Sequence, residues 1–329
     1  MKNYSASFVH RVPKTQNNEH GCVNVDTIPV DTKCLVIFGG ENTRTAKTAN
    51  YYMSCFERIV GTGVGIYSVI YNINNRLTSM DERARIRKSI RKNAIKPKDI
   101  PDASYILFQQ LMLPRIADNC KKIEYKEVLR RIQNLTLYAH CHGSVILYHF
   151  QQMLFNSMRN LGYTKRQTLE AMRHLCVVQH APVVPLAKNK FSTLSFMSAT
   201  DSFMKKYNIL PKWLIANAKD LTPSFFPKRY GNCIVASEIS YQTWFDHTIE
   251  GFDFPDMMTF DGHILFDAET QAITNCINRT KVLQPKDMIN GSIADFDTLC
   301  DNGARFYQQI QSINLNLRHA QNQSRAHQK

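Results

Sequence analysis

The turn around Cys141 constrains the fold of this chain more than any other feature of the sequence. Before it, residues 135–139 (LTLYA) form a mostly apolar run that predicts a buried β-strand. After it, residues 145–161 carry apolar side chains at helical spacing and predict an α-helix. Small residues, Ala139 and Gly143, lie two positions before and two positions after Cys141. We therefore expect the chain to turn sharply from a strand into a helix, with Cys141 at the turn.

Similar apolar runs recur along the chain and alternate with helical patterns. Cys34–Phe38 is a continuous apolar run stopped by two glycines, as expected for a strand buried on both faces of a parallel sheet. Residues 45–60 then carry apolar side chains at helical spacing. Further runs that predict strands are 66–71, 175–178, 193–197 and 233–236. Strands separated by helices predict an α/β fold, with a mostly parallel central sheet and helices on both faces.

The domain organisation follows from where this alternation begins and where it breaks. We expect an irregular N-terminal arm or an edge hairpin over residues 1–30, one α/β domain over 31–313 and a polar C-terminal tail over 314–329. Two segments do not fit the alternation, about 76–134 and 202–230. Insertions after sheet strands often cover a site as caps, so both segments are predicted cap insertions.

Composition and charge narrow the class of protein. The chain has 329 residues, 43% of them hydrophobic, which is enough to fill a sizeable core. The net charge of +14 favours anionic partners. Nine cysteines, an odd number without CxxC spacing, are typical of a reducing compartment. No segment reads as a signal peptide or a transmembrane helix, so we expect a soluble, cytoplasmic protein, and delivery to another cell stays open.

The run AHCHGS around Cys141 resembles the nucleophile elbow of the α/β-hydrolase superfamily. That elbow usually reads Gly-x-Ser-x-Gly, and lipase-like members read Ala-His-Ser-x-Gly, so cysteine here replaces serine. The resemblance implies an α/β-hydrolase-like fold with a helical cap. It also implies that Cys141 attacks a carbonyl carbon, as the cysteine does in dienelactone-hydrolase-like members. A helix N-terminus and adjacent imidazoles both favour the reactive thiolate form.

The resemblance also implies the chain order nucleophile, acid, histidine. The acid is expected just past the strand after next, where Asp201 follows the run 193–197; Asp201 could instead cap a helix that begins at the next residue. The histidine is expected in a loop after the final strand, where His263 lies in DGHIL, similar to the Gly-His stretch of many members. His247 is the rival base, since the gap between residue 236 and His263 is long. Either histidine could also be an ordinary surface residue.

Acyl transfer further requires donors for the oxyanion. The resemblance assigns one to the backbone amide of His142, which follows the nucleophile. It assigns the second to the loop after the first central strand, where Gly40 and Glu41 lie. No cofactor is required for this chemistry.

Other chemistries fit the sequence less well. Successive strand residues point to opposite faces, and the HCH run has no second Cys/His cluster near it, which argues against a metal site. The glycines of 61–65 follow a helix and precede a strand, the reverse of a phosphate-binding loop. The segment from Arg83 to Lys98 has eight basic residues and no acidic one, and its apolar spacing predicts a basic amphipathic helix. It could cap the domain or bind an anionic membrane surface; nucleic-acid binding is disfavoured as the main role because no recognition motif or interleaved aromatics occur.

The sequence therefore predicts an enzyme that cleaves or transfers an acyl group of a small-molecule or lipid substrate. It would resemble an esterase, thioesterase or lipase, with Cys141, His263 and Asp201 as its triad and an acyl-cysteine intermediate. The alternative is a catalytically inactive scaffold with a hydrolase fold that binds an anionic lipid or a protein partner.

Overall fold

The structure, a computed structural model, describes residues 5–12, 21–40, 43, 45–57, 59–72, 102–184, 189–201, 224–226, 233–236, 260–283 and 288. Within these residues nine strands form one sheet: β1 (Ser5–Arg11), β2 (Cys22–Val25), β3 (Cys34–Phe38), β4 (Gly65–Asn72), β7 (Leu135–His140), β8 (Cys176–His180), β9 (Ser192–Ser198), β10 (Ser224–Phe226) and β11 (Cys233–Ala236). Their order is β10-β11-β9-β8-β7-β3-β4-β1-β2. All pairs from β11 to β4 are parallel, and β10, β1 and β2 add to them in antiparallel pairs. The expected mostly parallel sheet is confirmed.

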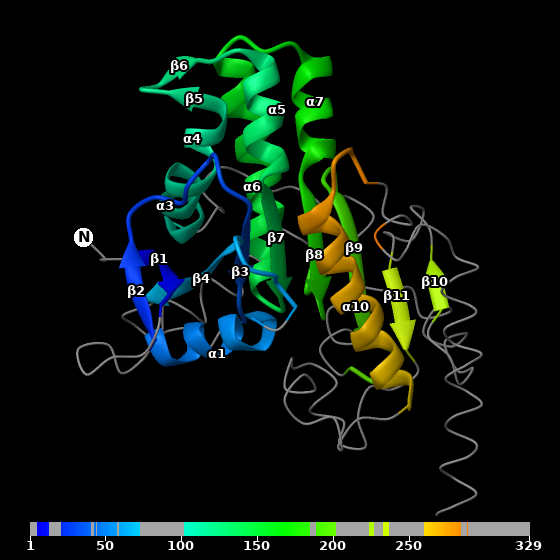
Figure 1. The fold of residues 1–329 in the computed structure, drawn as a ribbon. Helices are drawn as coiled ribbons and strands as arrows, with labels where there is room; N and C mark the ends of the chain where they lie inside the picture. The colour runs from blue at the N-terminus through cyan, green and yellow to red at the C-terminus, as the bar shows by residue number, and fades with distance from the viewer. Residues whose placement is uncertain are drawn as a thin grey trace, which may run out of the picture.

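Helices cover both faces of this sheet (Figure 1). Their bounds are α1 (Ala46–Glu57), α3 (Asp102–Leu111), α4 (Leu113–Ile116), α5 (Tyr125–Gln133), α6 (Gly143–Asn160), α7 (Lys165–His174) and α10 (Phe260–Asn278). Because strand side chains alternate, β7 places Tyr138 in the core beneath α1 and α10, and Leu137 in the core beneath α3, α5, α6 and α7. The central strands are buried on both faces, which explains their continuous apolar runs.

The structure agrees only in part with the predictions for the N-terminal arm and the two cap insertions. Of the N-terminal arm or hairpin, β1 and β2 form an antiparallel pair that extends the sheet, and β1 lies between β2 and β4. In the first predicted cap insertion, the described part (102–134) packs its apolar residues into the core beneath α6, so this part is a layer of the domain. A cap remains a prediction for the rest of that insertion. In the second, 202–230, the described residues are β10 at the sheet edge.

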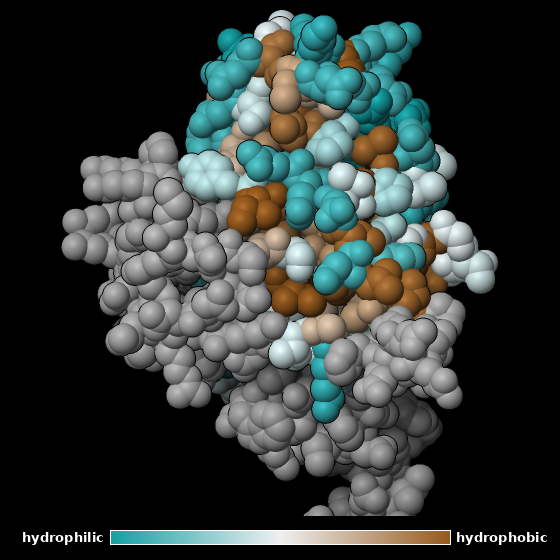
Figure 2. All heavy atoms as spheres, turned by 90° about the vertical axis from the view of Figure 1, so that its left-hand side faces the viewer, coloured by the Kyte–Doolittle hydropathy of each residue, from teal (hydrophilic) through white to brown (hydrophobic). Residues whose placement is uncertain are grey.

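A small hairpin lies apart from the main sheet. Its strands are β5 (Ala117–Asp118) and β6 (Lys121–Lys122), and Cys120 is exposed in the turn between them. Figure 2 views the molecule from the β1 and β2 side and shows mostly hydrophilic side chains over this upper end, with apolar side chains at the surface further down. None of the helices in the described part of the chain is long and apolar enough to cross a bilayer.

Gly143, the first residue of α6, fixes how closely the helix approaches the sheet. A Cβ added at Gly143 would lie 2.0 Å from the carbonyl oxygen of Phe38, the last residue of β3. Real atoms do not approach this closely, and the obstacle is backbone, which cannot rotate away. The small residue that the sequence pattern required at this position is therefore explained by contact with the neighbouring strand.

We predict that Gly143→Ala destabilises the fold by at least about 3 kcal/mol, because the end of β3 or the start of α6 must shift. Gly61→Ala is the matched control: no atom lies within 4 Å of a Cβ built there, so its cost should be about 0.5 kcal/mol or less. Urea unfolding of the two variants measures the difference. Equal unfolding free energies would show that the close approach at Gly143 is not needed.

Candidate active site

The sharp turn predicted at Cys141 is present. β7 ends at His140, α6 begins at Gly143, and Cys141 between them has a φ of 48°, in the left-handed region. That conformation costs an L-residue with a Cβ about 1–2 kcal/mol, so it persists only where the surrounding structure holds it. A strained residue between a parallel strand and a helix is the geometry of a nucleophile elbow. Together with the sheet, this turn makes the fold α/β-hydrolase-like.

Hydrogen bonds from neighbouring segments hold the strained turn. The backbone N–H of Cys141 donates to the carbonyl oxygen of His180 at 3.1 Å, which ties the turn to the end of β8. The carbonyl oxygen of Cys141 accepts from the N–H of Ser144 at 3.1 Å and from its hydroxyl at 2.6 Å. The same hydroxyl accepts the N–H of Val183 at 3.0 Å. The elbow is therefore braced by β8 and by the loop that follows it.

The thiol of Cys141 is more accessible than most thiols of the protein. Cys141 is partly exposed and Cys120 is exposed, whereas the other described cysteines are buried. Within the described residues the sulfur of Cys141 makes no hydrogen bond. No acidic residue lies in the first turn of α6, so the positive end of the helix dipole acts on the turn without a carboxylate to neutralise it. A partly exposed thiol at a helix N-terminus is the environment expected of a reactive cysteine.

The structure places Asp201 at the carboxyl edge of the sheet, three residues past the end of β9, as the sequence predicts. Its side chain is completely buried. Since β9 is the second strand from β7, the two strand ends lie about 10 Å apart, a gap that one imidazole can bridge. The residue after Asp201 lies outside the described part of the chain, so its alternative role as a helix cap stays a prediction.

His263 does not lie in a loop, and that expectation was wrong: it is the fourth residue of α10. Buried residues recur at helical spacing from the second turn of this helix onward (Leu265, Ala268, Ala272 and Cys276), and one glycine in the first turn does not prevent the helix from beginning earlier. Figure 1 shows the first, yellow end of α10 near the arrowhead of β11, so its first turn lies toward the carboxyl edge of the parallel strands, the edge at which Cys141 follows β7. His247 lies outside the described residues.

Of the three backbone amides predicted as oxyanion donors, two lie in the described part of the chain, and one of these two already donates to another group. His142 is the N-cap residue of α6, so its backbone amide lies at the helix N-terminus. The amide of Gly40 instead donates to the hydroxyl of Tyr52 at 2.9 Å, so it is engaged in this structure. Burial raises the pKa of Tyr52, which keeps the hydroxyl protonated. Glu41 lies outside the described residues, and its amide remains a predicted donor.

A group of polar side chains beneath the elbow was not predicted from the sequence. His180, the last residue of β8, and Glu269 of α10 are both completely buried, and Nδ1 of the imidazole lies 2.9 Å from Oε2 of the carboxylate. His140 does not flank the thiol as a free imidazole, since its Nδ1 lies 2.7 Å from the Tyr52 hydroxyl. One signal was available: Glu269 lies four residues after Leu265, on the apolar stripe of its helix.

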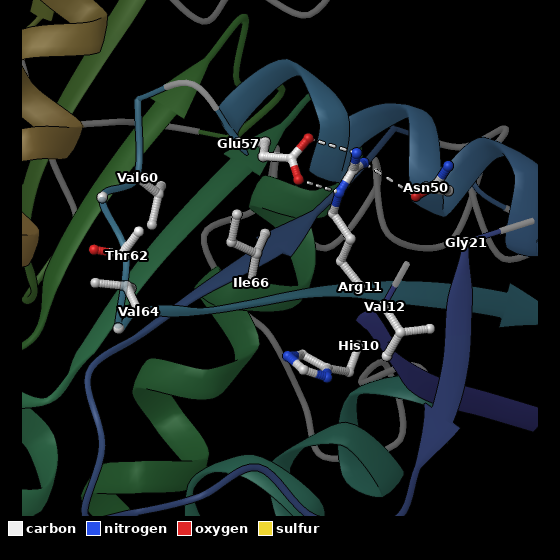
Figure 3. A pocket seen from close by; sticks show the side chains of 12 residues that line it. His10, Arg11, Val12, Gly21, Asn50, Glu57, Val60, Thr62, Val64 and Ile66 are labelled. Carbon is white, nitrogen blue, oxygen red and sulfur yellow. Dashed lines mark hydrogen bonds and ion pairs between the residues drawn. The ribbon is translucent and has the colours of Figure 1, made fainter. Parts of the chain in front are cut away.

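A separate pocket lies at the sheet edge where β4 begins (Figure 3). Its volume is about 570 Å³. Arg11 enters it from β1 and pairs with Glu57 through two contacts, of 2.9 and 2.5 Å, and donates to Asn50 at 3.2 Å. Glu57 therefore neutralises the guanidinium. This edge is opposite the one that carries Cys141. Among the residues that the structure describes, the predicted catalytic residues therefore do not line this pocket.

We predict that Cys141→Gly is more stable than Cys141→Ala by about 1 kcal/mol, since glycine adopts a positive φ without a Cβ clash. At Gln152, an exposed position within α6, the same two substitutions should reverse in order, with glycine less stable by about 0.5–1 kcal/mol. Thermal and urea unfolding of the four variants measures both differences. An alanine variant that is more stable than glycine at both positions would contradict a strained elbow.

Comparisons with known proteins give no family match and a loose structural likeness. No protein-family model matches the sequence, and no curated protein matches it. Among solved structures, the chain is similar to a protein assigned as a dienelactone hydrolase from Klebsiella pneumoniae subsp. pneumoniae MGH 78578, with a TM-score of 0.33 and 10% identity, covering 82% of this chain and 98% of that one. It is also similar to esterase 2 of Thermogutta terrifontis in its apo form, with a TM-score of 0.29 and 11% identity, covering 72% and 79%. Because TM-scores this low reflect loose overlap, the fold assignment rests on the chain's own strand order and elbow.

Proposed function

We propose that this protein is an acyl hydrolase or acyltransferase in which Cys141 is the nucleophile. The observation that carries the proposal is the left-handed backbone of Cys141 between a buried parallel strand and the N-terminus of α6. Strain of this kind is retained at functional sites because it presents a side chain that an unstrained turn would bury. Of the four described non-glycine residues with a positive φ, Cys141 is the one that lies between a parallel strand and the N-terminus of a helix, which points to chemistry of its thiol.

The reaction follows from the chemistry of an ester, thioester or related carbonyl group. The thiol proton moves to the imidazole of His263, and the sulfur forms a bond to the carbonyl carbon. The imidazolium then protonates the leaving group as the tetrahedral species collapses to an acyl-cysteine. Water, or a second acceptor, attacks this acyl-cysteine with the same imidazole as base and releases the free thiol. Asp201 orients the imidazole in both steps.

The oxyanion of each tetrahedral species needs backbone donors. The amide of His142 at the N-terminus of α6 is the first, and the amide of Glu41 is the second. Gly40 can serve only when its amide leaves the Tyr52 hydroxyl. This chemistry uses the residues of the chain alone and requires no cofactor. The substrate class is a small-molecule or lipid acyl compound.

The engaged amide of Gly40 favours a second candidate, a scaffold with a hydrolase fold that does not turn over. Such a scaffold would bind an anionic lipid or a protein partner through the basic segment from Arg83 to Lys98, which lies outside the described residues. A cysteine at a nucleophile position is compatible with both candidates, so the reactivity of its thiol separates them.

We predict that iodoacetamide at neutral pH modifies Cys141 at least about tenfold faster than Cys120, the exposed cysteine of the β5–β6 turn. Burial alone would give the opposite order, since Cys120 is the more exposed. Peptide mapping by mass spectrometry after timed labelling measures both rates. If Cys141 reacts no faster than Cys120, the enzyme proposal fails and the scaffold is favoured.

The base is tested by comparing His263→Ala with His247→Ala in hydrolysis of p-nitrophenyl butyrate. His263→Ala should lower kcat by about 100-fold or more, whereas His247→Ala should leave it within about twofold. The reverse pattern would transfer the role of base to His247 and leave Cys141 as nucleophile.

A further inference from the structure

Four aromatic rings form a buried row directly beneath the elbow, on the face of the sheet that α1 and α10 cover. Along this row the ring centroids of Tyr52 and His140 lie 5.9 Å apart, those of His140 and His180 5.8 Å, and those of His180 and Phe266 5.3 Å. All four side chains are buried. His140 and His180 are register partners in the parallel pair β7–β8, which places both rings on the same face. The row therefore runs from α1, across two strands, to α10.

Each end of this row connects to a part of the candidate active site. At one end, the hydroxyl of Tyr52 accepts the N–H of Gly40, in the loop assigned to the oxyanion. At the other end, Nδ1 of His180 pairs with Glu269, which lies on α10 six residues after His263. Above the row, the carbonyl oxygen of His180 accepts the N–H of Cys141. One residue, His180, thus holds the elbow with its backbone and α10 with its side chain.

Stability alone does not account for the His180–Glu269 pair. Both side chains are 0% exposed, and moving an imidazole and a carboxylate out of water is costly enough that a well-packed apolar pair is often as stable or better. Nε2 of His180 has no hydrogen-bond partner in the described part of the chain. What this hydrogen-bonded pair adds over apolar packing is a contact of fixed geometry between one strand end and one turn of α10.

Besides its apolar packing on the sheet, α10 is held by two polar anchors. Near the amino edge of the sheet, Arg279 directly follows the helix and donates to the carbonyl oxygen of Leu135 at 2.9 Å. Near the carboxyl edge, Glu269 is held by His180. The first turn of α10, with His263, extends about 9 Å beyond Glu269 along the helix axis. Loosening the second anchor would therefore move the first turn relative to Cys141.

We infer that His180 and Glu269 are positioning residues, which fix the first turn of α10 at the distance from Cys141 that proton transfer to His263 needs. This inference rests on the proposed function, because it assigns the pair to the base of that reaction. Among the described residues, the other titratable side chains near the pair include His140 beside His180 and Tyr138 beside Glu269; burial and the nearby Glu269 raise the pKa of Tyr138, so it stays neutral. Glu269 is thus the hydrogen-bonding partner of the imidazole side chain among the described residues.

The experiment uses the full-length chain and p-nitrophenyl butyrate, below the unfolding temperature of every variant. Glu269→Gln keeps the shape and an acceptor for Nδ1 but removes the carboxyl group, and His180→Ala removes the imidazole. His180→Asn keeps a donor near the Nδ1 position and is the conservative variant. Gln271→Ala is the matched control on α10, since this side chain pairs with Asn275 away from the site.

We predict that His180→Ala and Glu269→Gln lower kcat by about 10- to 100-fold with KM changed by less than about threefold, because a misplaced base slows chemistry more than binding. For His180→Asn, the drop in log kcat should be smaller than that of His180→Ala by about a third or more. The kcat of Gln271→Ala should stay within about twofold of that of the unmodified protein. The rate of Cys141 alkylation should stay within about threefold in all four variants, because the backbone bond to His180 remains. If His180→Ala does not fold, Glu269→Gln and His180→Asn carry the test.

A double-variant comparison separates positioning of the base from general damage. In a His263→Ala background, Glu269→Gln should have no further effect on kcat, because no imidazole remains to be positioned. A further loss equal to that in the unmodified background would overturn the inference, and so would a kcat within about twofold in both single variants. The variant Cys141→Ala distinguishes failure of the proposed function from failure of the positioning inference. If it retains turnover, the proposed function fails; if it is inactive while Glu269→Gln and His180→Ala are fully active, the positioning inference alone fails.

Discussion

The left-handed backbone of Cys141 is the constraint on which the rest of the site depends. It is held from three sides: α6 starts against the carbonyl of Phe38 at Gly143, β8 accepts the N–H of Cys141, and Ser144 closes the turn from within. The first two of these contacts depend on the parallel order β3-β7-β8. The central sheet thus serves as the rigid support that keeps a strained residue at its edge.

Most of the fold could be predicted from the sequence, because a parallel sheet buried on both faces leaves a strong local pattern. Cys34–Phe38 and Cys233–Ala236 are strands over the predicted residues, and the helix after Cys141 begins within two residues of its predicted start. The pairing of β1 with both β2 and β4 left no such pattern. Pairing partners depend on contacts distant in sequence, which periodicity does not record.

The candidate site was predictable where it depends on local sequence and not where it depends on tertiary contacts. Cys141 and Asp201 follow strand ends that the pattern marks. The bond from Gly40 to Tyr52 joins residues of different elements, and the sequence shows Tyr52 merely as one apolar position of a helix. His180 and Glu269 are likewise 89 positions apart in the sequence. Each stands out as a polar residue in an apolar run, but the sequence does not show that the two are partners.

The central claim is that Cys141 forms a covalent acyl intermediate, and the most direct measurement traps it. The protein is mixed briefly with an activated acyl ester, quenched in acid and analysed by intact and peptide mass spectrometry. We predict one acyl group on the peptide that contains Cys141. Hydroxylamine at neutral pH should remove this acyl group, and it should be absent from Cys141→Ala. Acylation that maps to another residue, or ester hydrolysis that persists undiminished in Cys141→Ala, would contradict the claim.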